Sequence, residues 1–148
     1  MERERYMSSE IDFYDNQETP TVVVRALDYP MAELPTLFHR VFGALFPALV
    51  QRQLTPTGAP FSLYTRAPSE TVDLEIGVPV SAALAEQIVV GDVVLEPSVL
   101  PAGAAARTSY FGGYDGLGQA WGSFMGAVAR AGRAPSFPFW EVYVTEPT

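Results

Sequence analysis

The sequence has 148 residues, and it contains no cysteine, no lysine and a single histidine, His39. Without cysteine there is no disulfide, thiolate nucleophile, iron–sulfur cluster or zinc site with sulfur ligands. Without lysine there is no Schiff base and no phosphate-binding lysine of a P-loop. One histidine is too few for a histidine-rich metal centre, and a Ser-His-Asp triad would have to use His39. We therefore expect no metal and no cofactor.

Positive charge is also scarce. Nine arginines stand against 17 acidic residues, which gives a formal net charge of −8. Phosphates require a basic face, so we expect no direct binding to nucleic acid. No apolar run reaches the roughly 18 residues of a membrane span. The charged start, residues 1–5, has no apolar stretch behind it and is no signal peptide, so we expect a cytoplasmic protein without membrane contact.

Carboxylates, hydroxyls and aromatic rings remain available, with 7 Tyr, 9 Phe and 2 Trp. The length and the hydrophobic content of 48% are typical of one domain with a real core. We expect that domain to span residues 10–148, after a flexible N-terminus of residues 1–9.

The hydrophobic spacing predicts two main helices. The first spans about residues 31–53, with Pro35 in its first turn and a kink or break at Pro47. The second opens within residues 111–116 and ends near Gly132. Residues 61–66 and 71–80 read as an antiparallel hairpin, in which Gly77 marks a bulge or a close backbone approach. Further strands are expected over residues 10–14, 21–26, 88–95 with an interruption at 91–92, 104–110 and 138–145.

The two halves of the chain repeat. Residues 22–66 align with residues 105–145, and both segments read as strand, turn, helix, loop and strand. Tyr64 then falls on Tyr143, and Ser62 falls on Glu141. Such a repeat indicates two similar α+β halves related by a pseudo-twofold axis, and a cleft between such halves is a natural ligand site.

Alternation along the strands separates their two faces. In the last strand Glu141 and Tyr143 share one face, and Trp140 lies on the other. In residues 71–80, Glu75 lies opposite the Leu74 face. We therefore expect each strand to have one face for the helices and one face that carries acids and tyrosines. That second face is either plainly solvated or a groove of carboxylate and rings that suits an apolar cation.

Three motifs give the sequence a family resemblance. Glu75–Val80 reads EIGVPV, Tyr110–Leu117 reads YFGGYDGL, and Trp140–Tyr143 reads WEVY. Over about residues 10–147 they resemble the GyrI-like small-molecule-binding domain, which is also the effector-binding half of MerR- and AraC-type multidrug-sensing regulators. The resemblance implies an α+β fold with duplicated β-α-β-β halves, two main helices on a curved antiparallel sheet, and a ligand groove between the halves. Fewer than ten residues precede the first strand, so we expect a stand-alone form without a helix-turn-helix domain.

The resemblance also implies a site. In this family the pocket carboxylate lies on the last strand, which corresponds to Glu141. Trp140 alternates with Glu141, so at most one of the two should face the groove squarely. Glu75 either lines the same groove or pairs with Arg66 or Arg107. The ligand-binding candidates are Glu141, Tyr143, Tyr114, Trp140, Tyr110, Phe111, Tyr64 and Glu75.

The resemblance implies three possible functions, and the residues are compatible with each. The first is a binding protein for hydrophobic, cationic or aromatic small molecules. The second is a metal-independent hydrolase that opens strained cyclopropane-bearing alkylating compounds, with Glu141 as base and Tyr114 or Tyr143 as proton donor. The third is a protein-interaction role, such as binding DNA gyrase through an acidic surface. The net charge is compatible with this role but does not favour it over the other two.

Overall fold

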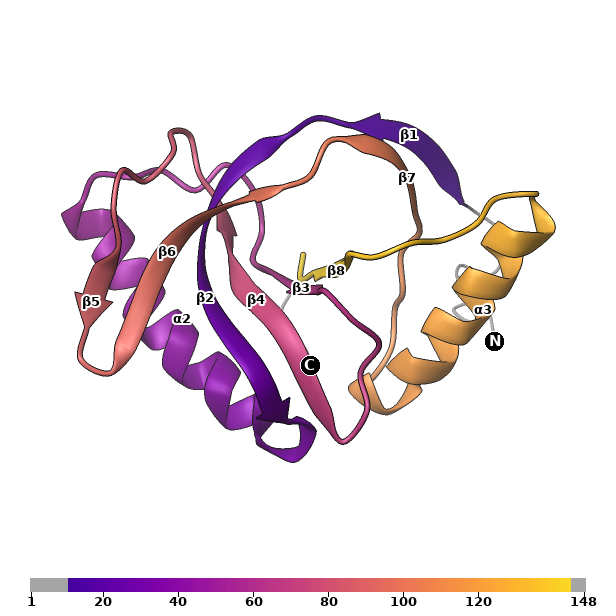
Figure 1. The fold of residues 1–148 in the computed structure, drawn as a ribbon, viewed down its shortest axis with the longest axis horizontal. Helices are drawn as coiled ribbons and strands as arrows, with labels where there is room; N and C mark the ends of the chain where they lie inside the picture. Colours follow the sequence, from indigo (N-terminus) through magenta and orange to yellow (C-terminus); the bar gives the residue numbers. More distant parts are fainter. Residues whose placement is uncertain (1–10, 145–148) are drawn as a thin grey trace. The chain divides into compact units, whose positions relative to one another are not determined.

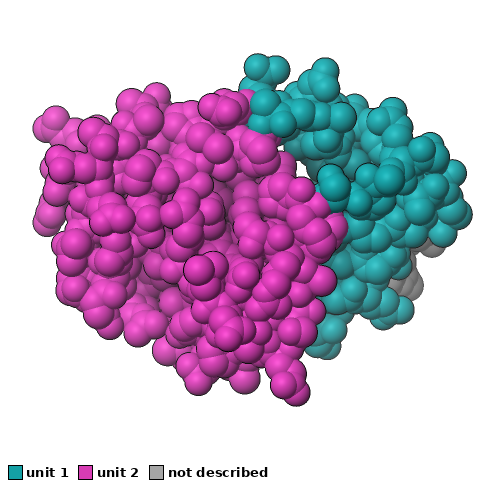
Figure 2. Space-filling model, viewed as in Figure 1, with its two compact units in different colours: residues 1–17, 102–136, 147–148 teal, residues 18–101, 137–146 magenta. Residues whose placement is uncertain are grey.

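The computed structural model describes residues 11–144. The predictions for residues 1–10 lie outside the described residues. The last strand ends at Val142, before its predicted end at Thr145, which itself lies outside the described residues. The chain folds into two compact units (Figure 2). The small unit comprises residues 1–17, 102–136 and 147–148, and the large unit comprises residues 18–101 and 137–146. Each unit has its own sheet, and the single domain over residues 10–148 stays a prediction.

The large unit is built on a curved six-stranded sheet (Figure 1). The strand order is β5-β6-β2-β4-β3-β8, and every neighbouring pair is antiparallel. The strands are β2 (Thr19–Pro30), β3 (Phe61–Tyr64), β4 (Thr71–Pro79), β5 (Ile88–Val90), β6 (Val93–Leu100) and β8 (Phe139–Val142). The predicted hairpin of β3 and β4 is confirmed. The interruption at Gly91 is the turn between β5 and β6, where Gly91 has a φ of 63° that glycine adopts at little cost.

One long helix, α2 (Leu34–Gln51), packs on this sheet after a 3₁₀ turn, η1 (Met31–Glu33). Pro35 lies in its first turn as predicted. Of the kink or break predicted at Pro47, the break is wrong, because the helix continues for four more residues to Gln51. Pro47 is exposed, and the last turn beyond it holds the buried Ala48 and Leu49, whose burial favours continuing the helix.

Two clusters of apolar side chains stabilise the sheet, one on each face. The main core fills the space between α2 and the sheet, with Leu45, Leu74 and Ile76 at most 1% exposed. The second cluster is on the opposite face and is centred on Val23, Phe61 and Leu63. Both faces of the central strands are therefore apolar.

Gly77 makes the close backbone approach that the sequence predicts. It pairs with Val23 across β2 and β4. A Cβ atom at position 77 would overlap the backbone carbonyl oxygen of Val22, so only glycine fits there without moving the strands apart.

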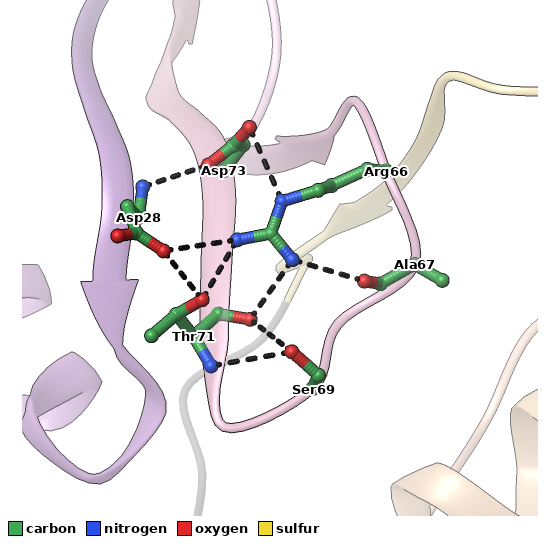
Figure 3. Close-up of polar contacts among 6 residues, drawn as sticks. All are labelled: Asp28, Arg66, Ala67, Ser69, Thr71 and Asp73. Atoms are coloured by element: carbon green, nitrogen blue, oxygen red, sulfur yellow. Dashed lines mark hydrogen bonds and ion pairs between the residues drawn. The ribbon is translucent and has the colours of Figure 1, made fainter.

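A polar cluster holds the β3–β4 turn against the far end of β2 (Figure 3). The Arg66 guanidinium lies 3.2 Å from the Asp73 carboxylate and donates to the Thr71 hydroxyl at 2.8 Å. The backbone N–H of Asp28 donates to Asp73 at 2.7 Å. Asp28 has a φ of 52° and lies in an irregularity of β2 between Ala26 and Tyr29. These bonds hold Asp28 in the left-handed region, which aspartate tolerates better than most residues.

The small unit consists of a two-stranded ribbon and a second helix. Strand β1 (Asp12–Asn16) pairs antiparallel with β7 (Gly103–Arg107), and η2 (Tyr114–Gly116) leads into α3 (Leu117–Arg130). Arg107 bonds Asp12 and lies over the Tyr14 ring. Strand β7 ends at Arg107, three residues before its predicted end at Tyr110. The α+β fold with two main helices and an antiparallel sheet is confirmed.

Candidate functional site

The register of β3 and β8 assembles a polar cluster on one face of the sheet. Ser62 pairs with Glu141, and the backbone N–H of Tyr143 donates to the carbonyl oxygen of Pro60 at 2.9 Å, which continues the alignment past β8. Because side chains alternate along a strand, Ser62, Tyr64, Glu141 and Tyr143 all project to the same side. We refer to these four residues as the tyrosine–glutamate cluster.

Hydrogen bonds join the members of the cluster. The Tyr143 hydroxyl donates to a carboxylate oxygen of Glu141 at 2.9 Å and lies 2.6 Å from the Ser62 hydroxyl. The Tyr64 hydroxyl, 3.3 Å away, is a second acceptor for the Ser62 hydroxyl. Ser62 is fully buried, so its hydroxyl depends on these two tyrosines.

Both tyrosines are held in their neutral form. Burial, and then the negative charge of Glu141, raise the pKa of Tyr143 far above its ordinary value of 10.0. The same two causes, in the same order, raise the pKa of Tyr64. At neutral pH both hydroxyls are therefore proton donors next to a carboxylate.

An aromatic row on α2 lies beside the cluster. The Phe38 ring meets Tyr143 edge to face, with centroids 6.2 Å apart. Phe38 stacks on Phe42 at 6.4 Å, and Phe42 stacks on Phe46 at 5.8 Å. Phe46 at the end of the row is 38% exposed. A carboxylate next to aromatic rings attracts flat or cationic molecules.

The predicted acid and tyrosine face does not exist as one surface. The tyrosine–glutamate cluster lies on the α2 side of the sheet, because Tyr64 packs against the main core. Leu63 pairs with Glu75, so Glu75 lies on the opposite side with the second cluster. The alternation itself is as predicted, and what is wrong is the assumption that every apolar face turns toward a helix. In β3 the apolar face points away from α2.

Glu75 has neither of the partners that the sequence suggests. It accepts from Arg25 at 2.9 Å and from the Ser98 hydroxyl at 2.8 Å. Arg66 is bound to Asp73 and Arg107 to Asp12 instead. Arg25 also binds Glu96 at 2.9 Å, so Glu75 belongs to a charged chain along this face.

Trp140 packs against the second cluster, on the side opposite Glu141. The expectation that the two do not share a direction agrees with this placement. Residues Tyr110, Phe111 and Tyr114 belong to the small unit. Tyr110 closes a tight turn by donating to the Gly113 carbonyl oxygen at 2.7 Å. Phe111 and Tyr114 are 55% and 63% exposed.

One member of the cluster, Ser62, and one neighbour, Phe38, were not predicted as site residues. Ser62 reads as an ordinary strand serine, and the signal for it was its superposition on Glu141 in the internal repeat. The spacing of Phe38 predicts a core position of the helix. The neighbouring sequence does not distinguish a ring that contacts a polar cluster from a ring that fills the core.

Within residues 11–144 no group of three or more His, Asp or Glu side chains is arranged to hold a metal ion. None of the described helices combines the length and the apolar character that crossing a membrane requires.

No family model matches the sequence, and no curated protein matches it. Solved structures do match. The EcmrR C-terminal domain, known from a crystal structure, is similar with a TM-score of 0.60 at 20% identity, over 82% of this chain and 75% of that domain. A chain of the EcmrR–DNA complex, known from cryo-EM, is similar with a TM-score of 0.59 at 22% identity. That match covers 86% of this chain and 47% of the other, so this chain spans about half the length of the EcmrR chain in the DNA complex.

At these identities the likeness concerns the fold. It agrees with the resemblance carried by the three sequence motifs, in which helices lie on a curved antiparallel sheet. The chain has the α+β fold of a GyrI-like domain, which it shares with the C-terminal domain of EcmrR.

Proposed function

We propose that the protein binds hydrophobic small molecules that are cationic or aromatic, and that the tyrosine–glutamate cluster is the contact point for their charge. One observation carries the proposal: the β3–β8 register puts one carboxylate, two tyrosine hydroxyls and the edge of an aromatic row in a single place. The GyrI-like fold supports an effector-binding role.

The physical basis is the combination of charge and rings. Glu141 supplies a negative charge beside partly buried tyrosines, where a ligand cation is attracted more strongly than in bulk water. Each ring face adds about 0.5–2 kcal/mol to the binding of a cation. Tyr64 and Tyr143 stay neutral, so they orient the carboxylate and add no charge of their own.

The other predicted ligand-binding residues lie in different parts of the structure. Phe111 and Tyr114, in the small unit, have exposed rings, and their part in ligand binding stays a prediction. Tyr110 is engaged in its own turn. Trp140 and Glu75 lie on the sheet face opposite Glu141, so we propose that neither touches the part of the ligand that contacts Glu141.

Dye titration tests the proposal. A cationic rhodamine should bind and quench, and fluorescein, an anionic dye of similar size, should bind much more weakly. Glu141→Gln should weaken the rhodamine at least about tenfold. Glu86→Gln removes the same charge at an exposed position of the large unit and should leave affinity unchanged. No rhodamine binding, or equal effects of the two variants, would refute the proposal.

Hydrolysis is a second candidate, favoured by the Tyr143–Glu141 hydrogen bond of 2.9 Å. In that reaction Glu141 takes a proton from water while the water oxygen bonds to a ring carbon and a ring C–C bond breaks. A tyrosine hydroxyl gives its proton to the group that receives the electron pair, and proton transfer from Glu141 to the tyrosine restores both residues. Mass spectrometry after incubation with a cyclopropane-bearing alkylating compound checks it. A product shifted by one water that disappears in Glu141→Gln supports hydrolysis, and unaltered compound at every protein concentration excludes it.

A further inference from the structure

Strands β2 and β6 pair over only part of their length. Thr19–Val23 of β2 pair with Glu96–Leu100 of β6, and Figure 1 shows the two strands diverging from there. β2 continues to Pro30 beside β4, and β6 begins at Val93 beside β5. Within residues 11–144, the facing edges of β2 and β6 have no strand partner across this opening. Their backbone groups are hydrogen-bonding groups without a ladder partner.

A cavity of about 270 Å³ occupies the opening. This size is just below the roughly 300–1,000 Å³ of most small-molecule sites, so it suits a compact ligand. Val24 of β2 and Leu37 and Val41 of α2 form an apolar floor, each at most 8% exposed.

Two ion pairs line the cavity as well. Arg25 binds Glu96 at 2.9 Å, and Arg40 lies 3.6 Å from Asp92. The second pair is loose, because the side chain of Asp92 is 77% exposed and the other contact of Arg40 is a 3.3 Å bond to the Tyr29 hydroxyl. Arg40 therefore has donors to spare out of its five N–H groups.

Glu96 also has spare capacity. One of its carboxylate oxygens accepts from Arg25, and the other accepts no hydrogen bond from the part of the chain that the structure describes. The lining thus offers a guanidinium donor and a carboxylate acceptor around an apolar floor. Its two arginines and two acids balance in charge.

We propose that this cavity binds a small zwitterion of the amino-acid type with an aliphatic side chain. The ligand's carboxylate replaces Asp92 on Arg40, and its ammonium group donates to the open oxygen of Glu96. Its hydrocarbon part covers Leu37 and Val41. A ligand with a single charge would engage only one of these two groups, whereas a zwitterion engages both. The site is separate from the tyrosine–glutamate cluster.

Calorimetric titration of the full chain tests this with three probes of one shape. L-leucine carries both charges, leucinamide lacks the carboxylate, and 4-methylpentanoate lacks the ammonium group. Leucine should bind at least about tenfold more tightly than either analogue. Equal affinity for all three probes, or no heat with leucine at tens of millimolar, overturns the proposal. This comparison uses the unmodified protein, so it does not depend on a variant that folds.

Variants locate the site. Arg40→Gln and Glu96→Gln should each weaken leucine about tenfold to a hundredfold. Arg52→Gln removes the same charge at the exposed end of α2 and should change nothing. Glu141→Gln should also retain leucine binding, which separates this site from the proposed dye site. Full affinity in a folded Arg40→Gln variant, or loss in Glu141→Gln, contradicts the assignment.

Discussion

The Tyr143 hydroxyl is the link between Ser62 and Glu141, and Tyr143→Phe removes it without changing the ring. The lost bond to the Glu141 carboxylate is of a kind that contributes about 1.5–3 kcal/mol, and the lost bond to Ser62 about 0.5–1.5 kcal/mol. The fully buried Ser62 hydroxyl keeps only Tyr64 at 3.3 Å. The phenylalanine gains back part of this because no hydroxyl has to be buried. We expect the free energy of unfolding to fall by about 2 kcal/mol.

Urea unfolding followed by tryptophan fluorescence measures this loss. Tyr114→Phe, at a side chain that is 63% exposed, should stay within about 0.5 kcal/mol of the wild type. In a double-mutant cycle, Ser62→Ala combined with Tyr143→Phe should cost about 1 kcal/mol less than the sum of the two single variants, since both remove the same bond. A Tyr143→Phe variant as stable as Tyr114→Phe would show that the hydrogen bonds do not hold the β3–β8 edge.

Repeating the urea unfolding at alkaline pH tests the same hydroxyl in a second way. The pKa of Tyr143 is higher in the folded protein than in the unfolded chain, so its contribution to stability is complete below pH 10 and is lost as the pH rises further. Above pH 10 the unfolded chain releases a proton that the folded protein keeps. The free energy of unfolding should therefore fall about 1.4 kcal/mol per pH unit less steeply in Tyr143→Phe than in the wild type. Parallel slopes would contradict the burial of this hydroxyl.

Further substitutions test the packing and the charges. Gly77→Ala forces β2 and β4 apart and should cost about 3 kcal/mol, whereas Gly43→Ala, on open helix surface, should stabilise by about 0.5–1 kcal/mol. Leu45→Ala opens the main core and should cost about 3 kcal/mol in the same urea experiment. The pKa of Asp73 lies below its ordinary value because the Asp28 backbone N–H and then Arg66 bond the carboxylate, so Arg66→Gln should raise it partway back, as measured by carboxyl NMR titration. An unchanged titration would exclude Arg66 as a cause.

The elements could be predicted because their signals are local. Leu34, Leu37, Val41 and Leu45 recur at helical spacing, and all four are buried against the sheet. Gly77 in a β-branched run indicated a close approach, which the backbone of β2 provides. The continuation of α2 past Pro47 could not be predicted in this way, because it depends on burial in the main core rather than on the residues around the proline.

The arrangement of the site was harder to predict for a related reason. Alternation identifies two faces of a strand and does not say which one a helix covers. In β3 the apolar residues Phe61 and Leu63 form the second cluster, and the polar face with Ser62 turns to α2. In a sheet with apolar packing on both sides, the polar face of a strand need not be the face that solvent reaches. The partner of Glu75 is likewise set by the strand order, which brings Arg25 next to it.

The internal repeat carries more about the site than the strand pattern does. It superposes Ser62 on Glu141 and Tyr64 on Tyr143, so the tyrosine–glutamate cluster consists of two pairs of counterparts. The observed antiparallel register places Ser62 directly opposite Glu141, its counterpart in the sequence repeat. Two glutamates at this point would face each other across the strands and repel. A serine on one side leaves a single carboxylate between two neutral tyrosines, which is the charge that the proposed binding of a ligand with one positive charge requires.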